Sequence, residues 1–156
     1  MVINMVVFIE NPDQRRQMAE DILHRLPDWF GMPESTAEYV QLSGGMPFWA
    51  YLKDGEPLGF IALKETIPYT AEICVMGVRK ERHRQGIGKA LFHALHEYAK
   101  EKGYEYLQVK TVRQGCYEEY DRTNAFYRKL GFRELECFPT LWDQRNPCQV
   151  YIMAIR

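Results

Sequence analysis

The sequence predicts a mixed α/β (α+β) domain with a mostly antiparallel central sheet of about seven strands, flanked by about four helices. Three observations support this prediction. Strand-like runs surround the pair Asp54-Gly55, which is typical of a β-hairpin turn. Apolar residues recur at helical spacing from Ile87 to Ala99. A chain of 156 residues that is 46% apolar can bury the core of one domain, so we expect residues 1–156 to form a single domain.

The chain begins with a predicted strand and a predicted helix. Val2 to Ile9 is rich in β-branched residues, and Asn11 begins a helix that stops before Pro27. Trp29 and Phe30 follow in a loop. They either cover the core or line a pocket for an acceptor substrate, and the sequence leaves both interpretations open.

A second helix and three strands are expected next. Ser35 and Thr36 offer an N-cap, and Glu38 stands at the capping-box spacing from Ser35, for a helix that ends near Gly44. The runs that follow are strand-like and predict an antiparallel meander. Its strands are expected at Phe48–Lys53, Pro57–Glu65 and about Thr70–Val78.

The clearest helix in the sequence is expected over residues 86–102, and Gly103 ends it. Because this long helix separates two strands, the strand Tyr106–Val112 is predicted to lie parallel to the preceding one. Three further elements complete the fold. They are a helix at Asp121–Leu130 and strands at Phe132–Phe138 and Cys148–Ile155, which a loop connects.

Composition argues against several functional classes. The formal charge of −1 gives no global reason to expect nucleic acid or a membrane surface as a partner. No apolar run is long enough to cross a bilayer and the start lacks a basic segment, so a cytoplasmic protein is expected. The four cysteines match no zinc-ligand spacing, so we expect reduced thiols and no metal.

One local stretch is both basic and rich in glycine. From Arg79 to Lys89 there are five basic residues and one acidic residue, Glu81. Gly86 and Gly88 let the backbone approach a ligand closely, and the helix that begins there directs free N–H groups and its positive dipole end toward that ligand. A phosphorylated ligand is therefore expected.

Two common phosphate-binding motifs fit this stretch poorly. A Rossmann dinucleotide site needs a glycine where Leu91 stands and a strand that ends at the first glycine, whereas Val78 lies eight residues before Gly86. A P-loop needs a glycine where His83 stands and a hydroxyl residue where Ala90 stands. A tight turn without a ligand stays open at this point.

Two motifs together closely resemble the GNAT superfamily of N-acetyltransferases. The first runs from Val78 through Arg84-Gln85-Gly86-Ile87-Gly88-Lys89 to Leu91, and the second is Asn124 to Phe132. The resemblance is strong over Glu72–Phe132, although His83 replaces the family's usual Gln or Arg. It implies a GNAT-like fold and direct transfer of acetyl from acetyl-CoA to a primary amine in a ternary complex.

The resemblance also implies which residues bind acetyl-CoA. Met76, Gly77 and Val78 would lie along the pantetheine arm, where one backbone N–H could polarise the acetyl carbonyl. Gly77 could equally mark an ordinary bulge. Asn124 matches a residue that contacts the CoA arm, or it is a helix-surface amide. The residues expected around the pyrophosphate are His83, Arg84, Gln85, Gly86, Ile87, Gly88 and Lys89.

Tyr127 and Glu72 are the catalytic candidates. Tyr127 matches the family's tyrosine that protonates the departing thiolate of CoA, although it could simply pack the helix. The acceptor amine must lose a proton, and Glu72 is the candidate base because it shares a strand face with Cys74 and Met76. An exposed strand glutamate is the alternative.

Acidic and aromatic residues are the candidates for acceptor binding. Glu118, Glu119 and Asp121 precede a predicted helix, where Asp121 is the expected N-cap and the cluster could attract a cation. Trp142 could wall a cation-holding pocket together with Trp29, Phe30 and Trp49, or it could be buried in a closed loop.

The sequence thus predicts an acetyl-CoA-dependent N-acetyltransferase whose acceptor is a small-molecule or peptide amine. A homodimer is compatible with the sequence, and neither nucleic acid nor a membrane is an expected partner. The alternative is a catalytically idle acyl-CoA-binding sensor or interaction module, which the presence of Tyr127 disfavours. Nucleic-acid binding by the basic run is disfavoured by the nearly neutral total charge.

Overall fold

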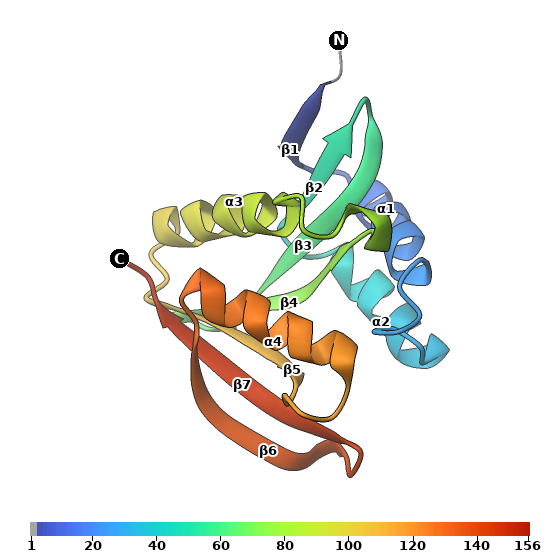
Figure 1. Ribbon diagram of the computed structural model, residues 1–156. Coiled ribbons are helices and arrows are strands. Elements are labelled where there is room, and N and C mark those ends of the chain that lie inside the picture. The colour runs from blue at the N-terminus through green and yellow to red at the C-terminus, as the bar shows by residue number, and fades with distance from the viewer. Residues whose placement is uncertain (1–2) are drawn as a thin grey trace. The chain divides into compact units, whose positions relative to one another are not determined.

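The computed structural model describes residues 3–156. Within them, seven strands form one sheet in the order β1-β2-β3-β4-β5-β7-β6, accompanied by four α-helices (Figure 1). β4 and β5 pair in parallel, whereas β1–β2, β2–β3, β5–β7 and β6–β7 pair antiparallel. The predicted fold class is confirmed.

The secondary-structure elements follow one another with short connections. In chain order they are β1 (Asn4–Phe8), α1 (Pro12–His24), α2 (Pro33–Ser43), β2 (Phe48–Lys53), β3 (Glu56–Ile67), β4 (Thr70–Val78), the short 3-10 helix η1 (Lys80–Arg82), α3 (Ile87–Glu101), β5 (Tyr106–Val112), α4 (Glu118–Leu130), β6 (Arg133–Asp143) and β7 (Asn146–Ala154).

Contacts divide the described residues into two compact units. The first contains residues up to Lys64 together with Cys74–Tyr98, and the second contains Glu65–Ile73 together with Ala99–Arg156. β3 and β4 contribute residues to both. The single domain over residues 1–156 therefore stays a prediction, and each unit is described by itself below.

The core of the first unit is built from α1, α2 and the strands β2, β3 and β4. Ile22 and Leu23 of α1 are fully buried in one hydrophobic cluster with Phe48 and Phe60, whose rings stack at a centroid distance of 5.0 Å. Burying each such side chain contributes about 1.5–3 kcal/mol. This cluster fixes α1 and α2 on the strands that lead to the glycine stretch.

The first strand and helix agree with the sequence prediction. β1 covers the expected segment from Asn4, whereas Val2 lies outside the described residues. The Asn11 side chain accepts hydrogen bonds from the N–H groups of Asp13 and Gln14 at 2.8 and 3.0 Å. These bonds satisfy two of the free donors at the start of α1, which explains why the helix begins there.

The start of α2 differs from the prediction. Pro33 is the first helical residue and Met32 is the N-cap, with no side-chain capping bond. Proline is favoured at the first helical position because its fixed φ suits the helix and because an N–H there would have no acceptor within the helix. Thr36 instead donates its hydroxyl to the Met32 carbonyl at 3.1 Å. The predicted capping box of Ser35 and Glu38 is wrong.

The β2–β3 turn confirms the predicted hairpin. Asp54 and Gly55 have φ angles of +50° and +82°. Positive φ at both central residues is the signature of a type I′ turn, whose twist matches that of the flanking strands.

The parallel pairing of β4 and β5 is also confirmed. Its register runs from Thr70 opposite Tyr106 to Ile73 opposite Val109, within the second unit. As in other parallel pairs, a helix forms the connection between the two strands. This register brings Glu72 opposite Gln108.

α4 begins earlier than predicted. Tyr117 is its N-cap and the helix starts at Glu118, so Asp121 lies inside the helix and the predicted N-cap is wrong. The Asp121 carboxylate accepts a hydrogen bond from the Gly115 N–H at 2.7 Å. Acidic residues in a first turn are favoured by the helix dipole, which accounts for Glu118, Glu119 and Asp121 without a ligand.

The final strands are longer than predicted and leave no extended loop between them. β6 and β7 are joined by a tight turn that the Asp143 carboxylate stabilises by accepting the Arg145 N–H at 2.8 Å and the Asn146 side-chain amide at 2.9 Å. These bonds lower the pKa of Asp143, the Asn146 amide being the main cause. Trp142 is 43% exposed on β6, so the expectation of a buried loop tryptophan is wrong.

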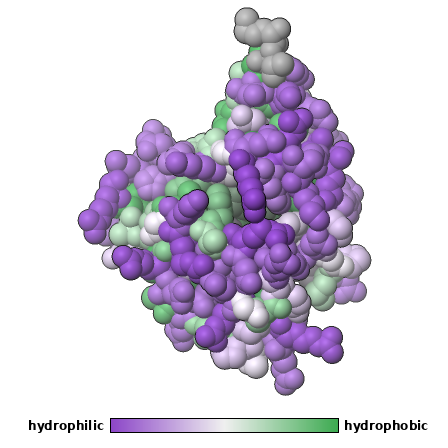
Figure 2. Space-filling view, viewed as in Figure 1, coloured by the Kyte–Doolittle hydropathy of each residue, from purple (hydrophilic) through white to green (hydrophobic). Residues whose placement is uncertain are grey.

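The surface is mainly polar. Hydrophilic residues cover most of the face shown in Figure 2, as expected of a chain that is 26% charged. Along residues 3–156, no helix combines the length and the hydropathy needed to cross a membrane.

Candidate functional site

The glycine stretch connects β4 to α3 in the first unit. Arg84 and Gly86 both have positive φ, at +66° and +79°, so the backbone turns sharply just before the helix. The first helical bond runs from the Ala90 N–H to the Gly86 carbonyl at 3.0 Å. The N–H groups of residues 87–89 therefore have no acceptor within the helix. A Cβ on Gly86 would meet no atom within 4 Å. The loop is thus open and lined with backbone donors, which suits an anionic ligand.

Part of the basic charge in this stretch is already paired. Arg79 is 8% exposed and contacts Glu56 at 2.9 Å and Asp21 at 3.5 Å. Lys80 pairs with Asp28 at 3.0 Å. These side chains attach the start of the loop to α1, to the segment that follows α1 and to β3. The charge available to a ligand is therefore smaller than the sequence suggests.

His83 anchors the loop. Its Nε2 lies 2.7 Å from the Val78 carbonyl oxygen, which can only accept, so Nε2 carries the proton and donates it. The ring also contacts Trp29 edge-on at 5.5 Å. These contacts were not predicted. They show that the histidine at this position holds the loop against the end of β4. Arg84, which follows His83 in the sequence, and Lys89 are exposed.

Gly77 is required by helix packing. A Cβ at this position would lie 3.0 Å from side-chain atoms of both Ile22 of α1 and Leu26, which follows the end of α1. The close approach of α1 to β4 accounts for a glycine at this position, and the contact of its backbone with the CoA arm stays a prediction. Met76 and Val78, its neighbours on β4, are half-buried.

Glu72 is buried in the second unit, so the expectation of an exposed strand glutamate is wrong. The residue is 8% exposed, and its Oε1 accepts hydrogen bonds from Gln108 Nε2 at 3.0 Å and Lys110 Nζ at 3.3 Å. Gln108 also donates to the Thr66 hydroxyl at 3.0 Å. A carboxylate with a cationic and an amide donor is compensated for its burial and is held in one orientation.

Tyr127 lies on α4 in the second unit and is 5% exposed. Its ring contacts Phe126, Phe132 and Tyr151 at centroid distances of 5.4, 5.8 and 6.3 Å. Burial, with a smaller contribution from Tyr120, raises the pKa of Tyr127 above its ordinary value. The phenol therefore keeps its proton at neutral pH, as a general acid requires.

Asn124 differs from one of its two sequence expectations. It is completely buried, and its side-chain amide donates to the carbonyls of Val112 at 2.8 Å and Tyr120 at 2.7 Å. Its Oδ1 accepts the hydroxyl proton of Tyr151 at 2.6 Å. The residue is therefore no helix-surface amide, and its contact with the CoA arm stays a prediction.

The predicted aromatic residues do not form one cluster. Trp29 and Phe30 pack against the core that contains Phe48, which favours the interpretation that they cover the core. Trp49 points to the other face of β2 because side chains alternate along a strand. There it contacts Tyr98 at 5.1 Å. The expected pocket of Trp29, Phe30 and Trp49 is therefore wrong, and Trp142 belongs to the second unit.

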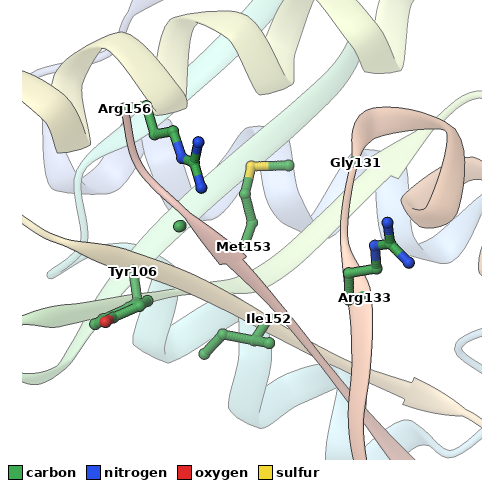
Figure 3. A pocket seen from close by; sticks show the side chains of 7 residues that line it. Tyr106, Gly131, Arg133, Ile152, Met153 and Arg156 are labelled. Carbon is green, nitrogen blue, oxygen red and sulfur yellow. The ribbon is translucent and has the colours of Figure 1, made fainter.

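A cavity of about 370 Å³ lies in the second unit, and none of its lining residues is a predicted site residue. Its lining comes from the starts of β5 and β6 and the end of β7, and Figure 3 shows the Met153 side chain between the guanidinium groups of Arg133 and Arg156. Sequence spacing gave no signal for it because three separate strands contribute. The lining residues are Tyr106, Gly131, Arg133, Ile152, Met153, Ala154 and Arg156.

The cysteines do not suggest a catalytic or metal site. All four are free thiols, and burial raises the pKa of Cys148 to about 11. Such a thiol is protonated and weakly reactive at neutral pH. In the described part of the chain, no group of three or more His, Cys, Asp or Glu residues is arranged to hold a metal ion.

Comparisons with known proteins agree with this arrangement. The family model described as acetyltransferase (GNAT) family matches residues 15–132. A GNAT-family protein of Desulfovibrio desulfuricans superposes with a TM-score of 0.83 at 17% identity, covering 99% of this chain and 100% of that one. Among curated protein sequences, none matches the chain.

Two further solved structures of similar fold have named activities. An aminoglycoside 6′-N-acetyltransferase in complex with coenzyme A gives a TM-score of 0.77 at 18% identity, covering 97% of both chains. The ribosomal-protein-S18-alanine N-acetyltransferase of Escherichia coli gives 0.76 at 20% identity, covering 98% of this chain and 94% of that one. At these identities the likeness concerns the fold.

Proposed function

The chain belongs to the acetyltransferase (GNAT) family, and on that premise we propose that it transfers acetyl from acetyl-CoA to a primary amine. The open loop before α3 is the observation that carries this proposal. Its left-handed residues Arg84 and Gly86, and the free N–H groups at the helix start, suit the pyrophosphate of acetyl-CoA. The exposed side chains of Arg84 and Lys89 add positive charge.

The reaction is a direct transfer in a ternary complex. The neutral amine nitrogen attacks the thioester carbonyl carbon, the C–S bond breaks, and the sulfur leaves as a thiolate that takes a proton. Tyr127 supplies that proton, because its buried phenol stays protonated at neutral pH. A backbone N–H of β4 near Met76, Gly77 or Val78 stabilises the charge that develops on the carbonyl oxygen.

Tyr127 is favoured over its neighbour Tyr151 as the acid. The phenol proton of Tyr151 is donated to Asn124 Oδ1 at 2.6 Å. A proton held in this buried hydrogen bond is not available to a thiolate without breaking the bond. The ring contacts of Tyr127 with Phe132 and Tyr151, by contrast, orient its phenol without using its hydroxyl proton.

Glu72 is the proposed base. The acceptor loses one proton as the amide forms, and a carboxylate is the group that can take it, directly or through a water chain. Lys110 and Gln108 both donate to Glu72 Oε1 and hold the carboxylate in one orientation. Both donors stand on β5, opposite or beside the glutamate.

The acceptor is a small-molecule or peptide amine. Incubation of the protein with acetyl-CoA and a panel of polyamines, amino acids, aminoglycosides and peptides, followed by mass spectrometry, would identify it. We expect at least one member to gain an acetyl group. Tight acetyl-CoA binding with no acetylated member would favour an idle acyl-CoA-binding module. A homodimer stays a prediction, and sedimentation equilibrium would test it by measuring the oligomeric state.

A further inference from the structure

A hydrogen-bonded group lies next to Tyr127 in the second unit, and two of its three side chains, those of Tyr151 and Asn124, are buried. It consists of Tyr151 on β7 and of Asn124 and Arg128 on α4. Asn124 precedes Tyr127 by three residues and Arg128 follows it directly, so the two lie on either side of it along the helix. The Tyr151 ring is 1% exposed and its centroid lies 6.3 Å from that of Tyr127.

The donors and acceptors in this group can be assigned without ambiguity. Asn124 Nδ2 faces the carbonyl oxygens of Val112 and Tyr120, which only accept. Its other atom, Oδ1, must therefore accept the single hydroxyl proton of Tyr151. The Tyr151 oxygen is then left to accept from Arg128 Nη1, at 3.3 Å. Each polar atom has one defined role, so the group favours one arrangement.

This arrangement attaches α4 to two strands at points that flank Tyr127. Asn124 reaches the last residue of β5 through Val112 and also reaches β7 through Tyr151. A rotation or shift of α4 that moved the Tyr127 phenol would break these bonds and leave buried polar atoms unpaired, which is costly. Burial raises the pKa of Tyr151, although Arg128 opposes the rise, so Tyr151 retains the proton that it donates.

We propose that Tyr151 is a positioning residue for Tyr127, and that its hydroxyl, acting through Asn124 and Arg128, holds α4 in the orientation that aims the Tyr127 phenol. The kinetic consequence rests on the proposed function of Tyr127 as general acid. The structural consequence does not, because the order of the Tyr127 ring can be measured without turnover.

The substitution Tyr151→Phe tests the proposal, with Tyr106→Phe as its matched control. Both remove one hydroxyl from a strand tyrosine of the second unit, but Tyr106 is 45% exposed and lies outside the group. Small displacements of a reacting group lower rates by up to about 10²-fold. We expect kcat to fall about tenfold in Tyr151→Phe with the KM for acetyl-CoA little changed, and neither to change in Tyr106→Phe.

A double variant separates positioning from a general loss of stability. If Tyr151 acts through Tyr127, adding Tyr151→Phe to Tyr127→Phe causes no further fall in kcat. A further tenfold fall in the double variant would overturn the proposal, because a merely structural effect lowers activity in both backgrounds.

A spectroscopic measurement tests, independently of activity, whether Tyr151 positions Tyr127. The ten tyrosines can be labelled with 3-fluorotyrosine, and the resonance missing in Tyr127→Phe identifies Tyr127. We expect this resonance to shift or broaden in Tyr151→Phe and not in Tyr106→Phe. An unchanged Tyr127 resonance in Tyr151→Phe would refute the positioning role. Wild-type kcat in Tyr127→Phe would instead refute the acid role, while the resonance would still report on positioning.

Discussion

Replacing Gly86 with alanine tests whether the loop before α3 binds acetyl-CoA through its backbone. Gly86 has a φ of +79°, and a Cβ there would meet no protein atom within 4 Å. The added methyl group thus enters open space that the proposed ligand would occupy. The left-handed conformation costs a residue with a Cβ about 1–2 kcal/mol, so we expect the variant to be less stable by about 1 kcal/mol.

Gly55 provides a matched control in the same unit. It has a φ of +82°, and a Cβ on it would also meet no atom within 4 Å. Gly55→Ala should therefore cost about the same stability, about 1 kcal/mol, in a turn to which no ligand is assigned. Urea denaturation of both variants measures this common cost. A difference between them in affinity for acetyl-CoA then shows that the ligand binds at Gly86.

Isothermal titration calorimetry measures the affinity for acetyl-CoA. We expect Gly86→Ala to weaken binding at least tenfold, which corresponds to about 1.4 kcal/mol, and Gly55→Ala to bind as the wild type does. Wild-type affinity in Gly86→Ala would refute the role assigned to the loop. Equal weakening in both variants would show that the loss follows from backbone strain rather than from blocked approach.

Three further substitutions test other parts of the account. Tyr127→Phe should lower kcat about 10²-fold with acetyl-CoA affinity retained, as measured by CoA release and calorimetry; an unchanged rate would exclude it as the acid. Glu72→Gln keeps the shape of the side chain but removes its charge, and should lower kcat by a similar factor of about 10² in the same assay. Cys148→Ala should reduce the alkaline loss of stability. The unfolded thiol ionises near 9.0 and the folded one near 11, so the free energy of unfolding is unaffected below pH 9 and falls as the pH rises from 9 to 11. Urea denaturation at several pH values should give a fall about 2 kcal/mol larger in the wild type, and equal falls would contradict the burial of this thiol.

The strands were predictable because their signals are local. β2, β4 and β5 have the predicted bounds, since alternation and turn residues lie within the segments themselves. Helix starts were less predictable. At α2, Pro33 took the first helical position ahead of the polar cap expected at Ser35. At α4, the acidic residues that suggested a cap occupy the first turn, where the helix dipole favours them equally.

Residues of the candidate site could be proposed from the sequence where a motif contains them. Their contacts with residues far away in the sequence could not. The motif pointed to Tyr127 and Asn124, but the buried role of Asn124 depends on Tyr151, which is 27 residues away in the sequence. The pairing of Arg79 likewise depends on Asp21, 58 residues earlier. Such contacts are set by the packing of whole elements, which one sequence does not reveal.

The same limit applies to Glu72. Strand parity indicated its face, but its burial and its bonds to Gln108 and Lys110 follow from the parallel register of β4 with β5. The parallel pairing was predicted, whereas the register was not. A one-residue slip would move every side chain of the strand to the opposite face and separate these groups.

The proposed reaction is the direct transfer of acetyl from acetyl-CoA to an amine. Mass spectrometry of a reaction with isotopically labelled acetyl-CoA follows the label in the amine and on the intact protein during the first turnover. Direct transfer predicts that the label passes to the amine at the rate of CoA release, with none held on the protein. Label that accumulates on the protein before it reaches the amine, or an amine that gains none, would contradict it.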